Sequence, residues 1–93
     1  MLEKDLEKKC CRIAQQHGWL VHPKVGSHAR GWPDRTFSRV IGDAFYELIF
    51  VEFKRPGAKP TRLQNHVADQ LRERDYAVHV IDNVEDAQSL FDR

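Results

Sequence analysis

Residues 45–54, Phe-Tyr-Glu-Leu-Ile-Phe-Val-Glu-Phe-Lys, are the stretch from which the fold can be worked out. Aromatic and β-branched residues dominate this stretch, which is typical of a β-strand. Both alternating sets of side chains are largely apolar, so we expect the strand to be central in its sheet. The Pro-Gly pair at residues 56–57 ends it.

One face of this strand changes from apolar to charged. Tyr46, Leu48 and Phe50 predict a buried face, and Glu52 and Lys54 continue that face at intervals of two residues. A carboxylate and an ammonium therefore lie together at the carboxyl end of the strand. A salt-bridged strand end in solvent would explain an isolated Glu-x-Lys pair equally well, so the pair needs a further group before it indicates a site.

Periodicity and turn residues predict the other elements. Apolar residues at spacings of three and four indicate a first helix, which Gly18 would stop: Leu2, Leu6, Cys10, Ile13 and Ala14. A second helix carries a stripe of Leu63, Val67 and Leu71, and Asn83 caps a last one. We expect, in chain order, a helix over residues 2–17, strands over 19–22, 35–41 and 45–54, a helix over 61–74, a strand over 77–81 and a helix to residue 91.

Composition indicates a single globular domain over residues 1–93. The chain is 41% apolar and 31% charged, with a net charge of +1, and no apolar run approaches the roughly 18 residues of a membrane span. The charged N-terminus lacks the apolar segment of a signal peptide, so we expect a cytoplasmic protein. Cys10 and Cys11 are adjacent and have no partner at zinc-binding spacing, which favours free thiols.

The distribution of charge is more informative than its sum. Residues 24–62 hold eight Lys and Arg against four Asp and Glu, whereas the rest of the chain holds seven against ten. A basic middle between acidic ends is compatible with a phosphate-facing surface, although an ordinary solvated face would also explain it.

Asp34 supplies the third group that the Glu-x-Lys pair needs. It opens the strand that would form a hairpin, through a turn at Gly42-Asp43, with the strand of Glu52. The hairpin would bring the two carboxylates together, with Lys54 nearby. Carboxylates bind hard divalent cations such as Mg²⁺ or Mn²⁺, and a lysine can orient water or neutralise charge during phosphodiester hydrolysis. The carbonyl of Phe53 is a further candidate ligand.

These residues carry a family resemblance. Pro33-Asp34, then seventeen residues, then Glu52-Phe53-Lys54 resembles the signature of the PD-(D/E)XK nuclease superfamily. The fuller pattern resembles the VRR-NUC (virus-type replication-repair nuclease) family, and within it the small stand-alone phage and bacterial members: residues 31–35 (Gly-Trp-Pro-Asp-Arg), residues 50–57 (Phe-Val-Glu-Phe-Lys-Arg-Pro-Gly) and Leu63-Gln64.

The resemblance implies a fold and an activity. The fold would be a restriction-endonuclease-like α/β core with a mixed sheet flanked by helices, in the order α-β-β-β-α-β-α. The activity would be metal-dependent cleavage of DNA, including branched DNA such as Holliday junctions, by a homodimer in a bacterial or phage-infected cell. A flap or nicking nuclease with the same site and a catalytically silent DNA-binding or interaction module are the alternatives.

Two further site residues follow from the resemblance. Such nucleases usually add a glutamate from the first helix, and Glu3 and Glu7 both flank its buried stripe, so geometry does not choose between them. The interval of eleven residues from Glu7 to Gly18 resembles that of cellular Holliday junction resolvases and favours Glu7. Gln64 matches a family glutamine, although Thr61-x-x-Gln64 is also a capping box.

Basic and polar side chains around the expected site are candidates for contacts with DNA phosphates, although charged loop residues are more often merely solvated. These candidates are Lys24, Ser27, His28, Arg30, Arg35 and Arg55.

Overall fold

The computed structural model describes residues 1–24 and 29–93. Its elements are α1 (Glu3–Gln16), β1 (Leu20–Val21), β2 (Arg35–Val40), β3 (Tyr46–Phe53), α2 (Arg62–Glu73), β4 (Ala77–Ile81) and α3 (Val84–Phe91). The predicted order of elements is confirmed, and their ends differ from the predicted ones by one residue at most. None of the described helices is long and apolar enough to cross a membrane.

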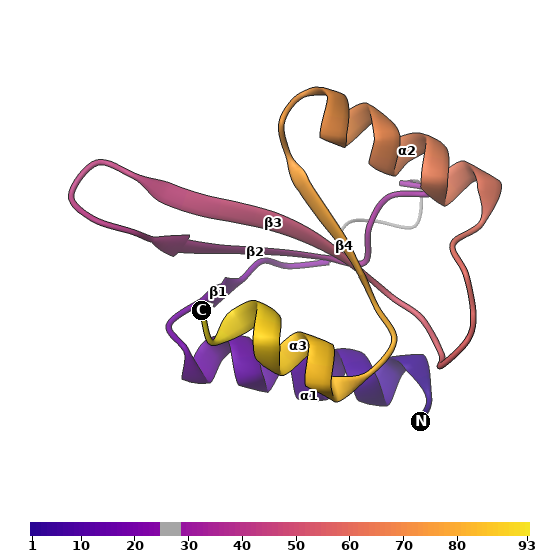
Figure 1. Ribbon diagram of the computed structural model, residues 1–93, viewed down its shortest axis with the longest axis horizontal. Coiled ribbons are helices and arrows are strands. Elements are labelled where there is room, and N and C mark those ends of the chain that lie inside the picture. The colour runs from indigo at the N-terminus through magenta and orange to yellow at the C-terminus, as the bar shows by residue number, and fades with distance from the viewer. Residues whose placement is uncertain (25–28) are drawn as a thin grey trace.

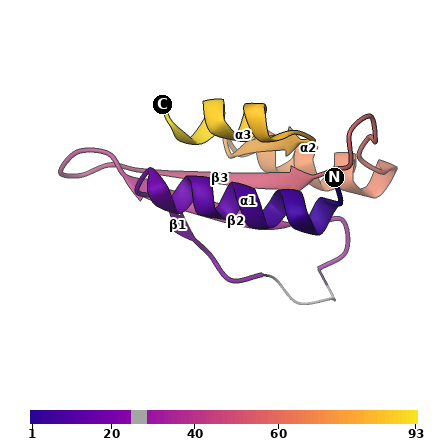
Figure 2. The same cartoon turned by 90° about the horizontal axis from the view of Figure 1, so that it is seen from below.

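The four strands form one mixed sheet in the order β1-β2-β3-β4. The pairs β1–β2 and β2–β3 are antiparallel, whereas β3 and β4 are parallel. A parallel pair needs a crossover connection, which α2 provides. In Figure 1, α2 covers one face of the sheet, and α1 and α3 cover the other. Figure 2 shows this second layer from below. β3 is thus a central strand, as its two apolar faces predicted.

Side chains of β3 alternate between two hydrophobic cores. Ile49, Val51 and Phe53 belong to the larger core, between the sheet and the helices α1 and α3. Phe50 belongs to the smaller core, which it shares with Ala68 and Leu71 of α2. Because successive side chains of a strand point to opposite faces, Glu52 lies on the α2 face of the sheet.

The C-terminus of α1 fixes the start of the sheet. Gly18 has a φ of +85°, and its N–H donates to the carbonyl of Gln15 at 3.1 Å, while the N–H of Trp19 donates to the carbonyl of Ala14 at 2.9 Å. This pattern is a Schellman motif, so the predicted role of Gly18 as the helix stop is confirmed. The indole N–H of Trp19 donates to the carbonyl of Phe91 at 3.0 Å and ties α1 to the end of α3.

Three apolar residues expected in the core lie at the surface instead: Leu2 is 57% exposed, Tyr46 73% and Leu63 45%. Leu2 is the N-cap of α1, with a φ of −72° and a ψ of 148°, so it lies outside the helical stripe. Tyr46 starts β3 where the hairpin extends beyond the helices (Figure 1), and Leu63 lies in the first turn of α2 over the backbone of Gly31.

Candidate active site

The β2–β3 hairpin brings two carboxylates together at the carboxyl end of β3. Arg35 lies opposite Val51 in the antiparallel ladder, so Asp34, one residue earlier, lies beside Glu52. Oδ2 of Asp34 accepts a hydrogen bond of 2.7 Å from the backbone N–H of Phe53. This bond holds the Asp34 carboxylate against the end of β3.

The segment directly before β2, residues 31–33, positions Asp34 at this site. Gly31 has a φ of +76°, and a Cβ atom there would lie 2.6 Å from Cγ of Leu63, so both the conformation and the space require glycine. Trp32 packs edge-on against Phe50 with ring centroids 6.0 Å apart. The buried Pro33 then stiffens the backbone directly before Asp34.

Glu52 is a buried carboxylate whose surroundings disfavour its charged form. Its residue is only 5% exposed. The pKa of Glu52 is raised from 4.5 to about 8, first by burial and then by hydrogen bonding with Asp34 and the negative charge of Asp34. The Lys54 ammonium acts in the opposite direction. The Glu52 carboxyl therefore resists ionisation at neutral pH unless a further cation compensates its charge.

Lys54 and Phe53 complete the end of the strand. The backbone N–H of Lys54 donates to the carbonyl of Ile81 at 2.9 Å, which extends the pairing with β4 past Glu52. Lys54 is half-buried, and its charge acts on Glu52. The Phe53 side chain is fully enclosed in the larger core, so only its backbone is available at the site.

Gln64 lies on α2 at the same site and also caps that helix. Its backbone N–H donates to Oγ1 of Thr61 at 3.1 Å, and its Oε1 accepts from the N–H of Thr61 at 2.8 Å. The predicted capping box is therefore confirmed. Gln64 and Glu52 line the same small cavity together with Pro33 and Pro60, and the cap fixes the glutamine side chain at this cavity.

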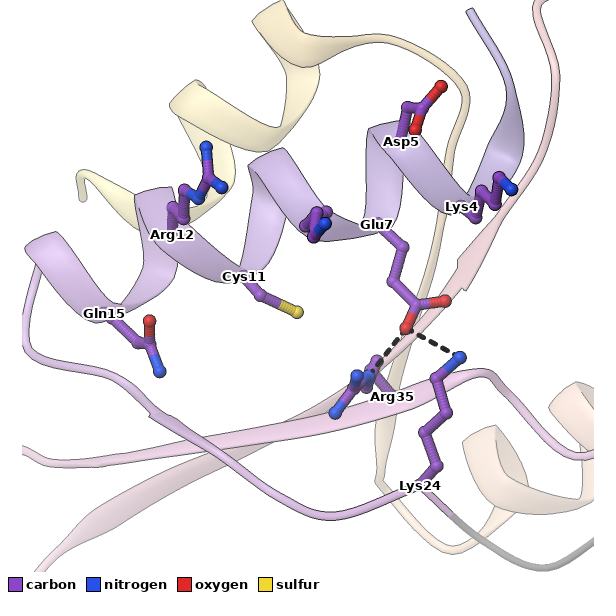
Figure 3. Close-up of a pocket in the computed structure, with 9 residues that line it drawn as sticks. Lys4, Asp5, Glu7, Cys11, Arg12, Gln15, Lys24 and Arg35 are labelled. Carbon is purple, nitrogen blue, oxygen red and sulfur yellow. Dashed lines mark hydrogen bonds and ion pairs between the residues drawn. The ribbon is translucent and has the colours of Figure 1, made fainter.

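The two glutamates of α1 have different surroundings. Oε2 of Glu7 lies 2.8 Å from Nε of Arg35 and 3.1 Å from Nζ of Lys24, and Figure 3 shows Glu7 extending from α1 toward both. Glu3, one turn earlier, is the α1 carboxylate whose charge adds to the raised pKa of Glu52. The sequence contains one signal for the different surroundings of the two glutamates. Arg35 directly follows Asp34, so its side chain points to the opposite face of the sheet, toward α1.

The other candidates for DNA contacts are spread over the surface. Arg35 also donates to the carbonyl of His22 at 3.2 Å. Arg30 and Arg55 are exposed in the segments just before β2 and just after β3. Ser27 and His28 lie outside the described residues.

The residues at the end of β3 fit a hard divalent cation. Among the described residues, no three His, Cys, Asp or Glu side chains converge to form a complete metal site. The chain instead offers two adjacent carboxylates, one of which is buried and resists ionisation in the absence of a cation. Oxygen ligands of this kind suit Mg²⁺ or Mn²⁺, which commonly take their remaining ligands from water and substrate phosphate.

A solved structure shares this architecture. A chain described as a VRR_NUC domain superposes with a TM-score of 0.80 and 26% sequence identity, covering 95% of this chain and 91% of that chain. This comparison confirms the resemblance to the VRR-NUC family. It supports a nuclease of the PD-(D/E)XK type, and the expected fold class is confirmed with it. No protein-family model matches the sequence, and no curated protein is significantly similar to it.

Proposed function

We propose that this chain is a divalent-metal-dependent endonuclease that hydrolyses DNA phosphodiester bonds, selects branched DNA such as Holliday junctions, and acts as a homodimer. The observation that carries the proposal is the meeting of Asp34 and Glu52 at the end of β3, with Lys54 beside them. Phosphodiester hydrolysis requires a place for a cation, a positioned water and compensation of developing negative charge, and this group of side chains suits all three needs.

Asp34 and Glu52 are the residues that would hold Mg²⁺ or Mn²⁺, together with the carbonyl of Phe53. When bound, a divalent ion polarises the phosphate and lowers the pKa of water. Asp34 is oriented for this role by the N–H of Phe53, at 2.7 Å. Glu52 is anchored in a central strand, which keeps its position rigid.

The neighbouring side chains have supporting roles in this proposal. Lys54 is a cation at neutral pH, so it orients the attacking water or stabilises the transition state rather than binding the metal. Gln64 contacts a phosphate or orders water in the cavity that it shares with Glu52. The α1 glutamate that would assist is Glu7, which the interval to Gly18 favours, or Glu3, whose charge acts on Glu52. Glu7 also pairs with Lys24 and Arg35.

The preference for branched DNA and the homodimer rest on the family resemblance. One structural feature is compatible with self-association: exposed apolar side chains gather at the end of the β2–β3 hairpin, away from the candidate site. We call this surface the hairpin patch, and it consists of Val40, Ile41, Phe45 and Tyr46. A twin subunit would supply a second active site for paired nicks across a four-way junction.

A panel of DNA substrates tests the proposed function. Linear duplex, flap, fork and four-way junction are incubated with the protein in Mg²⁺ and in Mn²⁺, and nicks are mapped on each strand. We expect symmetric paired nicks in the four-way junction. Preferential cleavage of the flap, or unpaired single nicks, would favour the alternative nuclease types. No cleavage of any substrate in either metal would favour a silent DNA-binding module.

A further inference from the structure

A groove of about 560 Å³ runs along α1, beside β2 and the segment that follows β1 (Figure 3). It is separate from the small cavity at Glu52. Two of the side chains that line it are acidic, Asp5 and Glu7, whereas five are cationic. We call it the α1 groove, and its cationic residues are Lys4, Lys8, Arg12, Lys24 and Arg35.

The acidic side chains of the α1 groove already have local roles. Oε2 of Glu7 is shared by Arg35 and Lys24, at 2.8 and 3.1 Å. The Lys24 side chain is nevertheless 60% exposed, so its ammonium still faces solvent at the groove. Asp5 lies in the first turn of α1, where a negative charge compensates the positive end of the helix dipole.

The remaining cations form a row along one face of α1. Lys4, Lys8 and Arg12 are spaced at intervals of four residues, so they lie above one another on one face of α1, with a rise of about 6 Å per step. No ion pair to any of the three occurs within residues 1–24 and 29–93. Like charges at this spacing destabilise a helix, and a lysine in the first turn opposes the helix dipole. An extended external anion would remove both penalties.

We infer that the α1 groove binds the sugar-phosphate backbone of a nucleic acid outside the cleavage site. The groove begins at the site end of the sheet, because Arg35 directly follows Asp34 and Lys4 directly follows Glu3. Its lining includes no large apolar side chain of the kind that forms the centre of protein–protein interfaces. A row of cations at regular steps suits the repeated phosphates of a strand instead. The path from the cleavage site along α1 rests on the proposed function, whereas backbone binding does not.

Salt-dependent binding of a labelled, unbranched DNA duplex in EDTA tests this inference, because chelation prevents cleavage. Each phosphate contact contributes about 0.9 to the slope of log affinity against log salt. We expect Lys8→Gln to reduce the slope by about 0.9, and the combined variant Lys4→Gln/Lys8→Gln/Arg12→Gln to reduce it by about 2 to 3. Lys9→Gln is the matched control, because Lys9 is the neighbouring lysine of the same helix but does not line the α1 groove.

A thiol probe locates the bound strand. Cys11 is half-buried in the α1 groove, while the adjacent Cys10 is fully buried and serves as an internal reference. Figure 3 shows the Cys11 side chain on the side of α1 that faces Arg35. We expect saturating duplex to slow the alkylation of Cys11 by iodoacetamide several-fold in the wild type and in Lys9→Gln, and to slow it far less in the combined variant.

Three outcomes would overturn the inference. The first is an unchanged salt slope in the combined variant, and the second is alkylation of wild-type Cys11 that duplex does not slow. The third is a combined variant that no longer binds phosphatidylglycerol vesicles, which the wild type binds, but still binds DNA like the wild type. Circular dichroism of each variant establishes that α1 is intact. Duplex cleavage in Mg²⁺ by a variant with an unchanged slope would reject the α1 groove and retain the nuclease. A reduced slope in a protein that cuts no substrate would retain the α1 groove and reject the nuclease.

Discussion

Glu52 is the residue that leads us to expect the candidate site to depend on a cation. Its carboxyl is buried and adjoins Asp34, so the metal-free protein is more stable when Glu52 is protonated. A divalent cation between the two carboxylates would replace that proton and remove their mutual repulsion. Proton and metal would therefore compete for the same group, and this competition would be measurable as a pH-dependent stability.

The metal-free protein should lose stability as the pH rises, in a way that depends on Glu52. Its pKa rises from 4.5 to about 8 on folding, so its stabilising contribution is complete below pH 4.5 and is lost as the pH rises through 8. We expect the free energy of unfolding of the wild type, measured with urea in EDTA, to fall relative to Glu52→Gln over this range. Mg²⁺ should restore it at high pH.

Glu73→Gln is the matched control for this measurement, because Glu73 is an exposed glutamate of α2 outside the site. It should reproduce the wild-type pH dependence. Parallel pH profiles for the wild type and Glu52→Gln would show that Glu52 titrates as it does in the unfolded chain.

Lys54 should contribute to chemistry more than to binding. Lys54→Met keeps much of the aliphatic stem and removes the charge, which is needed mainly when negative charge develops on the phosphate. We expect single-turnover cleavage at saturating enzyme to fall by roughly 10²-fold, about 3 kcal/mol in the barrier. A binding titration at fixed salt should change little, because one contact among several is a small share. Wild-type cleavage by the saturated mutant would reduce Lys54 to a salt-bridge residue.

At the scale of elements, the segment before β2 and the start of α2 are locked together. Leu63 lies over Gly31, and the next residue along α2, Gln64, caps the helix and lines the cavity of Glu52. Asp34 and Gln64 come from these two elements. The contact between Gly31 and Leu63 therefore helps to set the position of both polar groups.

Gly31→Ala should destabilise the protein more than Gly42→Ala. Both glycines have positive φ, +76° and +84°, so each substitution incurs about 1–2 kcal/mol of backbone strain. Only the new Cβ at Gly31 meets other atoms, at 2.6 Å from Cγ of Leu63, which adds about 1–3 kcal/mol. Urea denaturation measures the difference.

The double variant Gly31→Ala/Leu63→Ala identifies the cause. Leu63 is 45% exposed, so Leu63→Ala alone should lower the free energy of unfolding only slightly. Combined with Gly31→Ala, it should recover much of the stability that the contact with the new Cβ removes. Equal losses for Gly31→Ala and Gly42→Ala would contradict this account of the contact.

Local signals predicted the elements well because caps and stops act within a few residues. Gly18 and Asn83 mark helix ends through hydrogen bonds to nearby backbone groups. The predicted burial of Tyr46 was wrong because it depends on how far α2 extends over the sheet. Geometry did not separate Glu3 from Glu7, and only the interval to Gly18 favoured Glu7, for a similar reason: Glu7 pairs with Arg35, a residue distant in sequence that reaches α1 only in the folded chain.

At the scale of the whole molecule, the hairpin patch is the feature that the two cores leave unexplained. Val40, Phe45 and Tyr46 are each more than 70% exposed, and they are separated in space from the end of β3 that carries Glu52 (Figure 1). An apolar surface of this kind often marks a binding surface. The proposed homodimer would bury it while leaving both active sites open.

Light scattering tests the assembly. We expect twice the mass of one chain at micromolar concentration, and the monomer mass for Phe45→Ser/Tyr46→Ser, because these substitutions remove the apolar contacts. The monomeric variant should nick a four-way junction without pairing the nicks. A wild-type monomer that still resolves the junction symmetrically would refute the dimer.

Single-turnover cleavage of the best DNA substrate in Mg²⁺ and in EDTA tests whether Asp34 and Glu52 together support metal-dependent cleavage. We expect the wild type to cut only in Mg²⁺. Asp34→Asn should not cut in either condition, while melting cooperatively and binding DNA like the wild type, because it loses one of two anionic ligands. Undiminished cleavage by the wild type in EDTA, or by a folded Asp34→Asn protein in Mg²⁺, would contradict the account.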